Sequence, residues 1–383
     1  MGKSKAAQFA IVLLCGVVVW LVYKVPVPSP PRPAPHPPEL LPIQEVAPAW
    51  DGSYPFVVIK LAGSGKGHHR FQISIAPVKP TVRHEAPVNE FQVDLHSGMF
   101  VLRQTDLFVP DSLPLALTRT YRPWGFYVRA FGIGTNHPYD ICPTGTRFPY
   151  TYMNLNLEDD RPIHFPRISK GTDYSDAVYR HSDTSSEFYG AQIAWNGDGW
   201  TLDFRDGRRF LFPEAYNAKT YAQGAPTEMR DADGNRIQLK RDKVRNLEQL
   251  VSPHGHTISF KYDAANRIVE AADDAGNLRK YSYDTGGHMG SVSDDKHAGY
   301  RFSYDPLLHD LMTSIEDNEQ KVLLRNEYAD NSRVSAQTLA DGQIIQYDYL
   351  YDRKGNIVET TVTLPGHRVR HFFFRNGIPA GKR

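Results

Sequence analysis

The sequence has few of the features that would fix its fold or partners at once. It contains only two cysteines in 383 residues, Cys15 and Cys142. Because Cys15 lies in an apolar N-terminal run and Cys142 lies far beyond it, we expect no intramolecular disulfide, and packing must hold the fold. Lys and Arg number 44 against 43 Asp and Glu, a net charge of +1. This balance gives no general attraction to nucleic acid, so we expect no nucleic-acid partner.

Motifs that would mark a catalytic or metal centre are missing as well. The sequence contains no Gly-x-Ser-x-Gly nucleophile elbow and no His-Glu-x-x-His zinc helix. His254 and His256 lack a third ligand, so we expect no metal and no cofactor. The acidic pair Asp159 and Asp160 falls in a polar turn stretch. We therefore predict no catalytic residue and no enzyme; a glycoside-acting enzyme of the cell envelope, with two opposed carboxylates, is an alternative.

An apolar run near the N-terminus predicts a membrane anchor. Residues 6–23 are 18 positions in which Gln8 is the only clearly polar side chain. As a helix they span about 27 Å, close to a bilayer core of about 30 Å. Lys3 and Lys5 favour a cytoplasmic tip over residues 1–5 and a periplasmic or extracellular location for the bulk of the chain. A cleaved signal peptide and a buried soluble helix are the alternatives.

A proline-rich stretch follows the apolar run. Nine prolines lie between Val25 and Pro42. They exclude helix and sheet ladders and favour polyproline II, so we predict a stalk over residues 24–49. Two apolar runs then flank a glycine-rich tip at residues 63–67, which predicts a β-hairpin over 50–80.

The segment 87–145 predicts short strands and tight turns. Phe91, Val93 and Leu95 alternate with polar residues, and Ser97-Gly98 interrupts the pattern. Four blocks follow in order: Val93–Phe100, Thr105–Leu107, Pro114–Tyr121 and Phe131–Gly134. They resemble the domain that precedes the repeats in Rhs and related polymorphic-toxin proteins. One departure is Thr135, where that family usually has Trp. The resemblance implies structural roles for Asp94, Gly98, Asp106, Arg119, Tyr121, Gly132 and Gly134.

A β-rich connecting region over 146–230 leads into a repeat over 231–374, with a tail over 375–383. Aromatic residues recur at Tyr262, Tyr283, Tyr304, Tyr328, Tyr349 and Phe373, in steps of 21, 21, 24, 21 and 24. A period near 20 residues, with units too small to fold alone, predicts stacked strand pairs. Within a unit, alternate residues share one face, so aromatic side chains gather on that face. The predicted repeat core is Phe260, Tyr262, Tyr281, Tyr283, Phe302, Tyr304, Tyr328, Tyr347, Tyr349 and Phe373.

An aspartate directly after the tyrosine predicts a turn. Three residues further on stands Asn266, Gly287 or Gly355, residue types that tolerate a left-handed backbone. This spacing fits a type I turn closed by a G1 bulge, in which the carboxylate accepts hydrogen bonds from turn amides. The predicted turn residues are Asp263, Asn266, Asp284, Gly287, Asp352 and Gly355.

The repeated tyrosine and aspartate resemble the YD repeat of Rhs proteins and insecticidal toxin complexes. The resemblance implies a mainly β fold of antiparallel hairpins wound into an open spiral sheet or partial shell. In that family long arrays enclose a toxic C-terminal domain, which a self-cleavage motif with Asp-Pro and a glycine releases. Here Asp305-Pro306 lacks the glycine and only nine residues follow Phe374, so we expect no toxin domain.

These features predict a membrane-tethered, non-catalytic binding or shell module at the cell envelope. A glycan, a peptide or another envelope protein is the expected partner, and a row of exposed tyrosines, Tyr347, Tyr349 and Tyr351, is one candidate surface for it. The truncated core of a polymorphic-toxin delivery system is the main alternative, and an envelope polysaccharide-acting enzyme is the second.

Overall fold

The computed structural model describes residues 92–380 except 124–126, 184–185, 295–298, 308–309 and 376–377, together with the backbone of 58–60 and 72–74. The described chain is mainly β, as predicted, and all its paired strands run antiparallel. Its only helical elements are the 3-10 turn η1 (Pro138–Asp140) and the short helix α2 (Tyr221–Gly224). In the predicted hairpin segment, β1 (Val58–Lys60) pairs with β2 (Gln72–Ser74).

The predicted location, a single-pass membrane protein, is corrected by the structure. Among the described residues no helix is long and apolar enough to cross a bilayer. A spanning helix needs about 20 apolar residues, whereas α2 has four. The predicted anchor at 6–23, its tip at 1–5 and the stalk at 24–49 lie outside the described residues.

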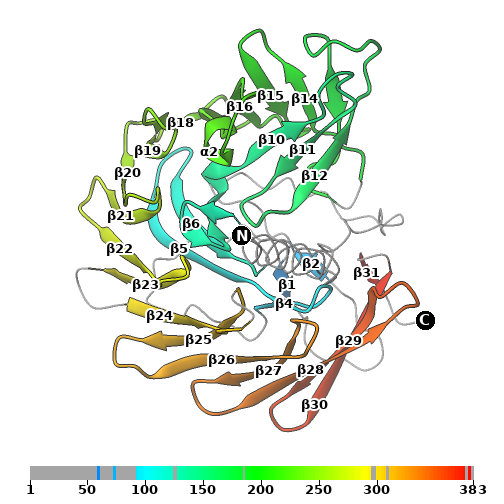
Figure 1. Cartoon of the computed structure of the whole chain (residues 1–383), viewed down its shortest axis with the longest axis vertical. Helices are drawn as coiled ribbons and strands as arrows, with labels where there is room; N and C mark the ends of the chain where they lie inside the picture. Colours follow the sequence, from blue (N-terminus) through cyan, green and yellow to red (C-terminus); the bar gives the residue numbers. More distant parts are fainter. Residues whose placement is uncertain are drawn as a thin grey trace, which may run out of the picture. The chain divides into compact units, whose positions relative to one another are not determined.

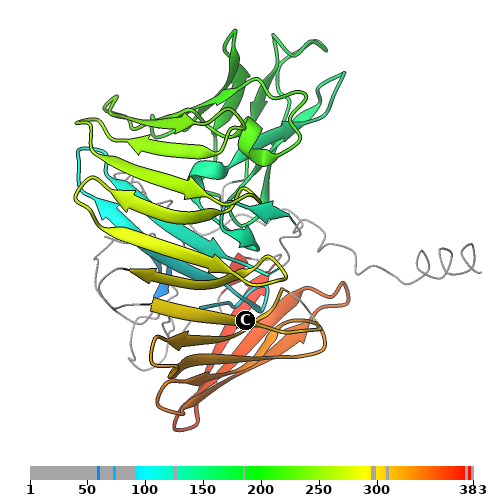
Figure 2. The same ribbon diagram turned by 60° about the vertical axis from the view of Figure 1, so that its left-hand side comes forward.

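Strands β13 to β31 form one sheet of 19 strands, in which each strand pairs with the next one along the chain. β13 and β31 do not pair with each other, so the sheet is open. In Figure 1 its strands follow one another in an arc, and Figure 2 shows the same succession of hairpins from another side. The strands are β13 (Val178–Arg180), β14 (Gln192–Trp195), β15 (Gly199–Asp203), β16 (Arg209–Pro213), β17 (Glu228–Arg230), β18 (Arg236–Arg241), β19 (Leu247–Val251), β20 (Thr257–Tyr262), β21 (Ile268–Asp273), β22 (Leu278–Tyr283), β23 (Met289–Asp294), β24 (Gly299–Tyr304), β25 (Met312–Asp317), β26 (Val322–Tyr328), β27 (Val334–Leu339), β28 (Ile344–Tyr351), β29 (Ile357–Leu364), β30 (Arg368–Arg375) and β31 (Ile378–Ala380).

Alternate residues of the repeat strands face one side of this sheet. On β20, Phe260 is buried whereas its neighbours Ser259 and Lys261 are exposed. The equivalent residues of β22 and β24, Tyr281 and Phe302, are also buried. The alternation arises because successive side chains of a strand point to opposite faces. One face of the sheet therefore carries a continuous aromatic and aliphatic core.

A second tyrosine in each unit joins neighbouring units. The hydroxyl of half-buried Tyr262 donates to the backbone oxygen of Leu247 at 2.9 Å, 15 residues earlier. Burial raises the pKa of Tyr262 far above its usual value, so the hydroxyl stays a protonated donor. Distances of 2.5–3.0 Å recur for the pairs Tyr283–Ile268, Tyr304–Met289, Tyr328–Met312 and Tyr349–Val334.

The turns after these tyrosines have the geometry expected from the sequence. Asp263 Oδ1 accepts from the amides of Ala265 and Arg267, both at 2.9 Å. Asn266 has a φ of +59°, and the strand register shifts by one residue at the end of β20, as in a bulge. The same left-handed position is held by Gly287 after Asp284 and by Gly355 after Asp352.

One predicted repeat-core residue, Phe373, lies differently from the prediction. Phe373 is half-buried, whereas Phe372 and Phe374 are buried. Phe372 pairs with Thr360, a buried residue of β29, and directly paired residues share a face.

The predicted row of exposed tyrosines on β28 is wrong. Tyr347 is buried, and its hydroxyl donates to Gln337 Oε1 at 2.5 Å. The hydroxyl of Tyr349 donates to the backbone oxygen of Val334. Of the three tyrosines, only Tyr351 is exposed. Because alternate residues of the strand face the core, this strand offers no aromatic ladder to a ligand.

The segment ahead of the long sheet contains short strands and one long hairpin. β5 (Leu102–Val109) pairs with β6 (Leu115–Tyr121), and every residue of β6 is buried. Figure 1 shows this hairpin on the inner side of the arc. The remaining strands are β3 (Val93–Asp94), β4 (Met99–Phe100), β7 (Val128–Arg129), β8 (Gly132–Ile133), β9 (Thr135–Asn136), and the three-stranded sheet β10 (Cys142–Gly145), β11 (Tyr152–Asn156) and β12 (Pro162–Pro166).

Replacing Tyr283 or Tyr349 by Phe tests the contacts between neighbouring units. Each change removes one donor from a backbone oxygen of the preceding unit, so we expect the free energy of unfolding to fall by about 1 kcal/mol. Tyr152→Phe is the control, since this tyrosine is 36% exposed and its hydroxyl bonds to no other described residue. Urea denaturation followed by circular dichroism measures the three losses. Equal losses would contradict a role for these hydroxyls.

Candidate functional site

The β5–β6 hairpin carries a buried ion pair. Arg119 Nε lies 2.5 Å from Asp106 Oδ2, and the two side chains are 3% and 1% exposed. Arg119 Nη2 donates to Asp106 Oδ1 at 3.0 Å and to Gln104 Oε1 at 2.7 Å. The guanidinium fork and the carboxylate thus meet through two parallel hydrogen bonds, the arrangement that best offsets the cost of burying both charges.

The long sheet completes this ion pair. The hydroxyl of Tyr281, on β22, donates to Asp106 Oδ2 at 2.8 Å. The Arg119 guanidinium carbon lies 5.9 Å from the ring centre of Tyr281 and 5.8 Å from that of Phe302. Aromatic faces attract a cation at such distances. Two predicted repeat-core residues therefore contact two predicted motif residues of the preceding segment.

Tyr121 and Gly132 make further contacts with the sheet. The Tyr121 hydroxyl donates to the backbone oxygen of Asp310 and accepts from the amide of Met312 at 2.9 Å. The amide of Ile133 donates to the oxygen of Gly287 at 3.0 Å. A Cβ on Gly132 would lie 2.4 Å from that same oxygen. Only glycine permits so close an approach.

The remaining motif residues lie at the start of the segment and within it. The oxygen of Gly98 accepts from the amide of Val334 at 2.9 Å. Asp94 accepts from the amide of His96 at 3.1 Å and closes a local turn. Gly134 has a φ of +70°, and its oxygen accepts from the amide of Arg122. Five of the seven predicted motif residues thus contact the sheet, and Asp94 and Gly134 shape the segment itself.

Asp106→Asn and Arg119→Met test the buried ion pair. Each change leaves the partner buried without its counter-charge, so we expect the free energy of unfolding to fall by about 3–5 kcal/mol. Asp203→Asn is the control, because it breaks a pair with Arg209 whose side chains are 43% and 51% exposed. We expect a loss of about 1 kcal/mol or less for it. Similar losses for buried and exposed pairs, in chemical denaturation, would contradict this account.

A second group of charges joins the β5–β6 hairpin to the turn between β11 and β12. Arg103 Nη2 lies 2.9 Å from Glu158 Oε1, and Arg161 Nε lies 2.5 Å from Asp159 Oδ2. Glu158 and Asp159 are 4% and 8% exposed. The polar turn predicted here therefore buries two of its acids, because arginines neutralise them.

Glu187, near this group, gives a pH dependence that can be measured. Its Oε2 has no hydrogen-bond partner, and burial, with Arg208 opposing it, raises its pKa to about 7. The folded state therefore binds the proton more tightly than the unfolded state. We expect stability to be highest below about pH 4.5 for this group and to decline as the pH rises through about 7.

Glu187→Gln should remove that decline. Urea denaturation between about pH 4.5 and 8 measures it, with Glu319→Gln, at an exposed turn, as the matched control. The control should keep the wild-type slope. An unchanged slope in Glu187→Gln would contradict the raised pKa.

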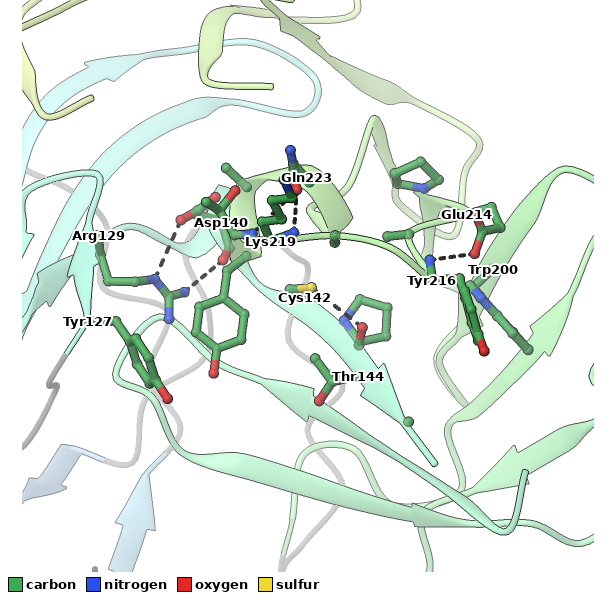
Figure 3. Close-up of a pocket in the computed structure, with 18 of the residues that line it drawn as sticks. Tyr127, Arg129, Asp140, Cys142, Thr144, Trp200, Glu214, Tyr216, Lys219 and Gln223 are labelled. Atoms are coloured by element: carbon green, nitrogen blue, oxygen red, sulfur yellow. Dashed lines mark hydrogen bonds and ion pairs between the residues drawn. The ribbon is translucent and has the colours of Figure 1, made fainter. Parts of the chain in front are cut away.

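A pocket of about 1220 Å³ opens between β7, β10, β16, α2 and turns of the first repeat units. Figure 3 shows its residues converging from these elements. From one end to the other, the labelled side chains are Tyr127, Arg129, Asp140, Lys219, Gln223, Cys142, Thr144, Glu214, Tyr216 and Trp200.

Aromatic rings form the walls of the pocket. Tyr150, Tyr174, Trp195 and Trp200 make a chain of contacts with successive centroid distances of 5.9, 5.1 and 5.3 Å. At the other end, the ring of Tyr127 packs against that of Tyr221. Such edge-to-face contacts hold the rings in place.

Buried polar groups form the floor. Arg129 is 4% exposed; it lies 3.6 Å from Asp140 Oδ2 and pairs with Asp160. His137 is 1% exposed, and neither ring nitrogen has a hydrogen-bond partner. Burial lowers the pKa of His137 to about 4, so its ring is neutral at pH 7. Burial also raises the pKa of Cys142 to about 12, which leaves its thiol unreactive.

Two cations lie at the rim. The Arg147 guanidinium carbon lies 4.0 Å from the ring centre of Tyr216, and Arg147 Nη2 donates to the backbone oxygen of Tyr216 at 3.4 Å. Neither Arg147 nor Lys219 has a carboxylate partner among the described residues. Glu214, the nearby acid, accepts from the amide of Tyr216 at 2.5 Å. The rim is therefore basic and aromatic.

Sequence reasoning missed this pocket. Of the predicted site residues, only Tyr262 and Asn266 line it. The other lining residues come mainly from 127–223, most of which the sequence identifies only as a β-rich connecting region. The Tyr and Trp content of this region is the one sequence signal that could have indicated the pocket.

The two histidines noted in the sequence each pair with a carboxylate in the structure. His254 pairs with Asp111, and His256 Nδ1 lies 2.8 Å from Asp274 Oδ2. Within the described ranges, no group of three or more His, Cys, Asp or Glu is placed to hold a metal ion.

A family described as a domain of unknown function, DUF6531, matches residues 91–165. This match overlaps the segment that resembles the pre-repeat domain. The match covers 75 of the 383 residues, and the described chain beyond it is a β-rich sheet of repeated hairpins. The search of curated proteins found no match.

Several solved structures are similar to part of this chain. The TcdB2–TccC3 complex without its hypervariable C-terminal region is 15% identical, with 72% of this chain and 15% of that chain covered and a TM-score of 0.31. The Tc holotoxin pore of Photorhabdus luminescens is 14% identical over 72% of this chain and 14% of that chain, with a TM-score of 0.31. A porin-like protein from Bacteroides uniformis is 10% identical over 50% and 91%, with a TM-score of 0.24. The chain spans about 15% of the length of the first two, so its function must be argued from its own residues.

Proposed function

We propose that this protein is a non-catalytic binding module, in which the pre-repeat segment and the long sheet form a scaffold that presents the aromatic pocket. The observation that carries the proposal is the pocket itself, with its ring-lined walls and basic rim on a buried polar floor. Large concave sites with apolar walls and a few polar groups are the usual places where proteins bind ligands.

Two arginines of the scaffold hold the floor of the pocket in place. Arg241, on β18, donates to the backbone oxygen of Tyr139 at 2.6 Å, and lies 3.9 Å from Asp140. Arg129 donates to the oxygen of Asp140 at 3.0 Å. These contacts tie the 3-10 turn η1 to the sheet. A floor held this way is ordered before a ligand arrives, so binding does not have to order it.

A shell segment of a toxin-delivery protein is a second candidate, favoured by the resemblance of the repeated hairpins to the repeat of Rhs proteins. In that role the arc of repeat hairpins would form part of a wall around a partner. The β5–β6 hairpin already covers the face around Tyr281 and Phe302, which leaves less of that face for a passenger. The pocket has no evident use in a passive wall, so we favour binding. That the protein is not an enzyme stays a prediction.

A ligand panel tests the binding proposal. The full chain is probed with a mixed array of glycans and peptides. We expect at least one class to bind, and Tyr216→Ala to abolish that binding. Tyr189→Ala is the matched control, because this exposed ring also has an arginine, Arg205, over it but lies outside the pocket. If no ligand on the array binds, or if Tyr216→Ala binds as well as the wild-type chain, the proposal is overturned.

A further inference from the structure

We infer that the pocket binds an oligosaccharide that carries carboxylate groups. The inference rests on the proposed function and names its ligand class. It is built from two features of the described pocket: exposed rings and rim cations without a carboxylate partner. Each feature selects a different property of the ligand.

The exposed rings select a ligand with flat, partly apolar units. Tyr127, Tyr174 and Tyr216 are 62%, 41% and 50% exposed, yet each ring is held by a neighbouring aromatic or arginine. A held ring can stack on the C–H face of a sugar and lose little side-chain entropy. The pocket volume of about 1220 Å³ exceeds the usual range for a single small ligand, so several linked units fit it.

The floor supplies no free charge to a ligand. His137 is neutral at pH 7, and both of its ring nitrogens are closed off from solvent. Arg129 pairs with Asp140 and Asp160, and its Nε, which is also closed off from solvent, has no hydrogen-bond partner. The charge of a ligand must therefore be recognised at the rim of the pocket.

The rim selects negative charge. Arg147 and Lys219 have no carboxylate partner among the described residues, while one oxygen of Glu214 is occupied by the Tyr216 amide. A carboxylate on the ligand would supply the missing partner. A charge-assisted hydrogen bond of this kind contributes about 1.5–3 kcal/mol, roughly a tenfold to hundredfold effect on affinity.

The edge of the neighbouring sheet argues against an extended peptide. β10 is the edge strand of its three-stranded sheet and lines the pocket, so a peptide could in principle add to it. Pro143 lies within this four-residue strand and has no amide hydrogen. A short edge interrupted by proline is a poor template for strand addition. The side chains, rather than the backbone, must therefore recognise the ligand.

Isothermal titration calorimetry of the full chain at pH 7 and low salt tests the inference. The probes are tetragalacturonate, neutral cellotetraose and the acidic peptide tetraglutamate. We expect tetragalacturonate to bind at least about tenfold more tightly than either of the others. Arg147→Ala should weaken it at least about tenfold, and Arg147→Lys, which keeps the charge, less. Arg205→Ala, the matched arginine over Tyr189, should change Kd by less than about twofold.

The outcomes separate this inference from the proposed function. If cellotetraose or tetraglutamate binds as tightly as tetragalacturonate, and Tyr216→Ala abolishes that binding, the pocket is a ligand site but the inferred ligand class is wrong. If Arg147→Ala binds tetragalacturonate like wild type, the rim charge plays no part and the inference is also overturned. If nothing binds in a Tyr216-dependent way, in these titrations or on the mixed array, both proposals fail. Thermal unfolding of each variant shows whether a loss reflects the site or the fold.

Discussion

The contact of Asp106, Arg119 and Tyr281 joins parts of the chain that are 175 residues apart, and much of the structure depends on it. A repeat sheet of this kind exposes one apolar face, and that face needs a cover. The β5–β6 hairpin supplies the cover and brings a charge with it. Because that charge is buried, only one placement of the hairpin satisfies it, so the ion pair selects the position as well as holding it.

The pocket follows from this placement. The chain that leaves β6 passes through β7, Gly132 and η1 before it reaches β10, and each step is tied to the sheet or to its arginines. Arg241 holds η1, and Arg129 holds Asp140. The aromatic walls then come from strands β14 and β15, from the short helix α2 and from turns outside these elements. A ligand site assembled from distant segments in this way is ordered only when the docking is intact.

The local parts of the structure could be predicted from the sequence, and the long-range parts could not. Asp263 and Asn266 lie close together in the chain, so turn chemistry alone indicates their geometry. The alternation around Phe260 is equally local. Phe373 was misplaced because three consecutive phenylalanines leave the strand register undetermined, and a shift of one residue reverses the faces. The family resemblance marks Arg119 as a structural residue, yet nothing in the spacing identifies Tyr281 as its neighbour.

Hydrogen–deuterium exchange measured by mass spectrometry tests the central claim most directly. If the hairpin and the sheet are one cooperative unit, amides of β6 and of β22 to β25 share the same high protection, and weakening the ion pair lowers both together. The account predicts this joint loss of protection in Asp106→Asn. Rapid exchange in β6 with unchanged protection in β22 to β25 would contradict it, since the hairpin would then lie on the sheet without stabilising it.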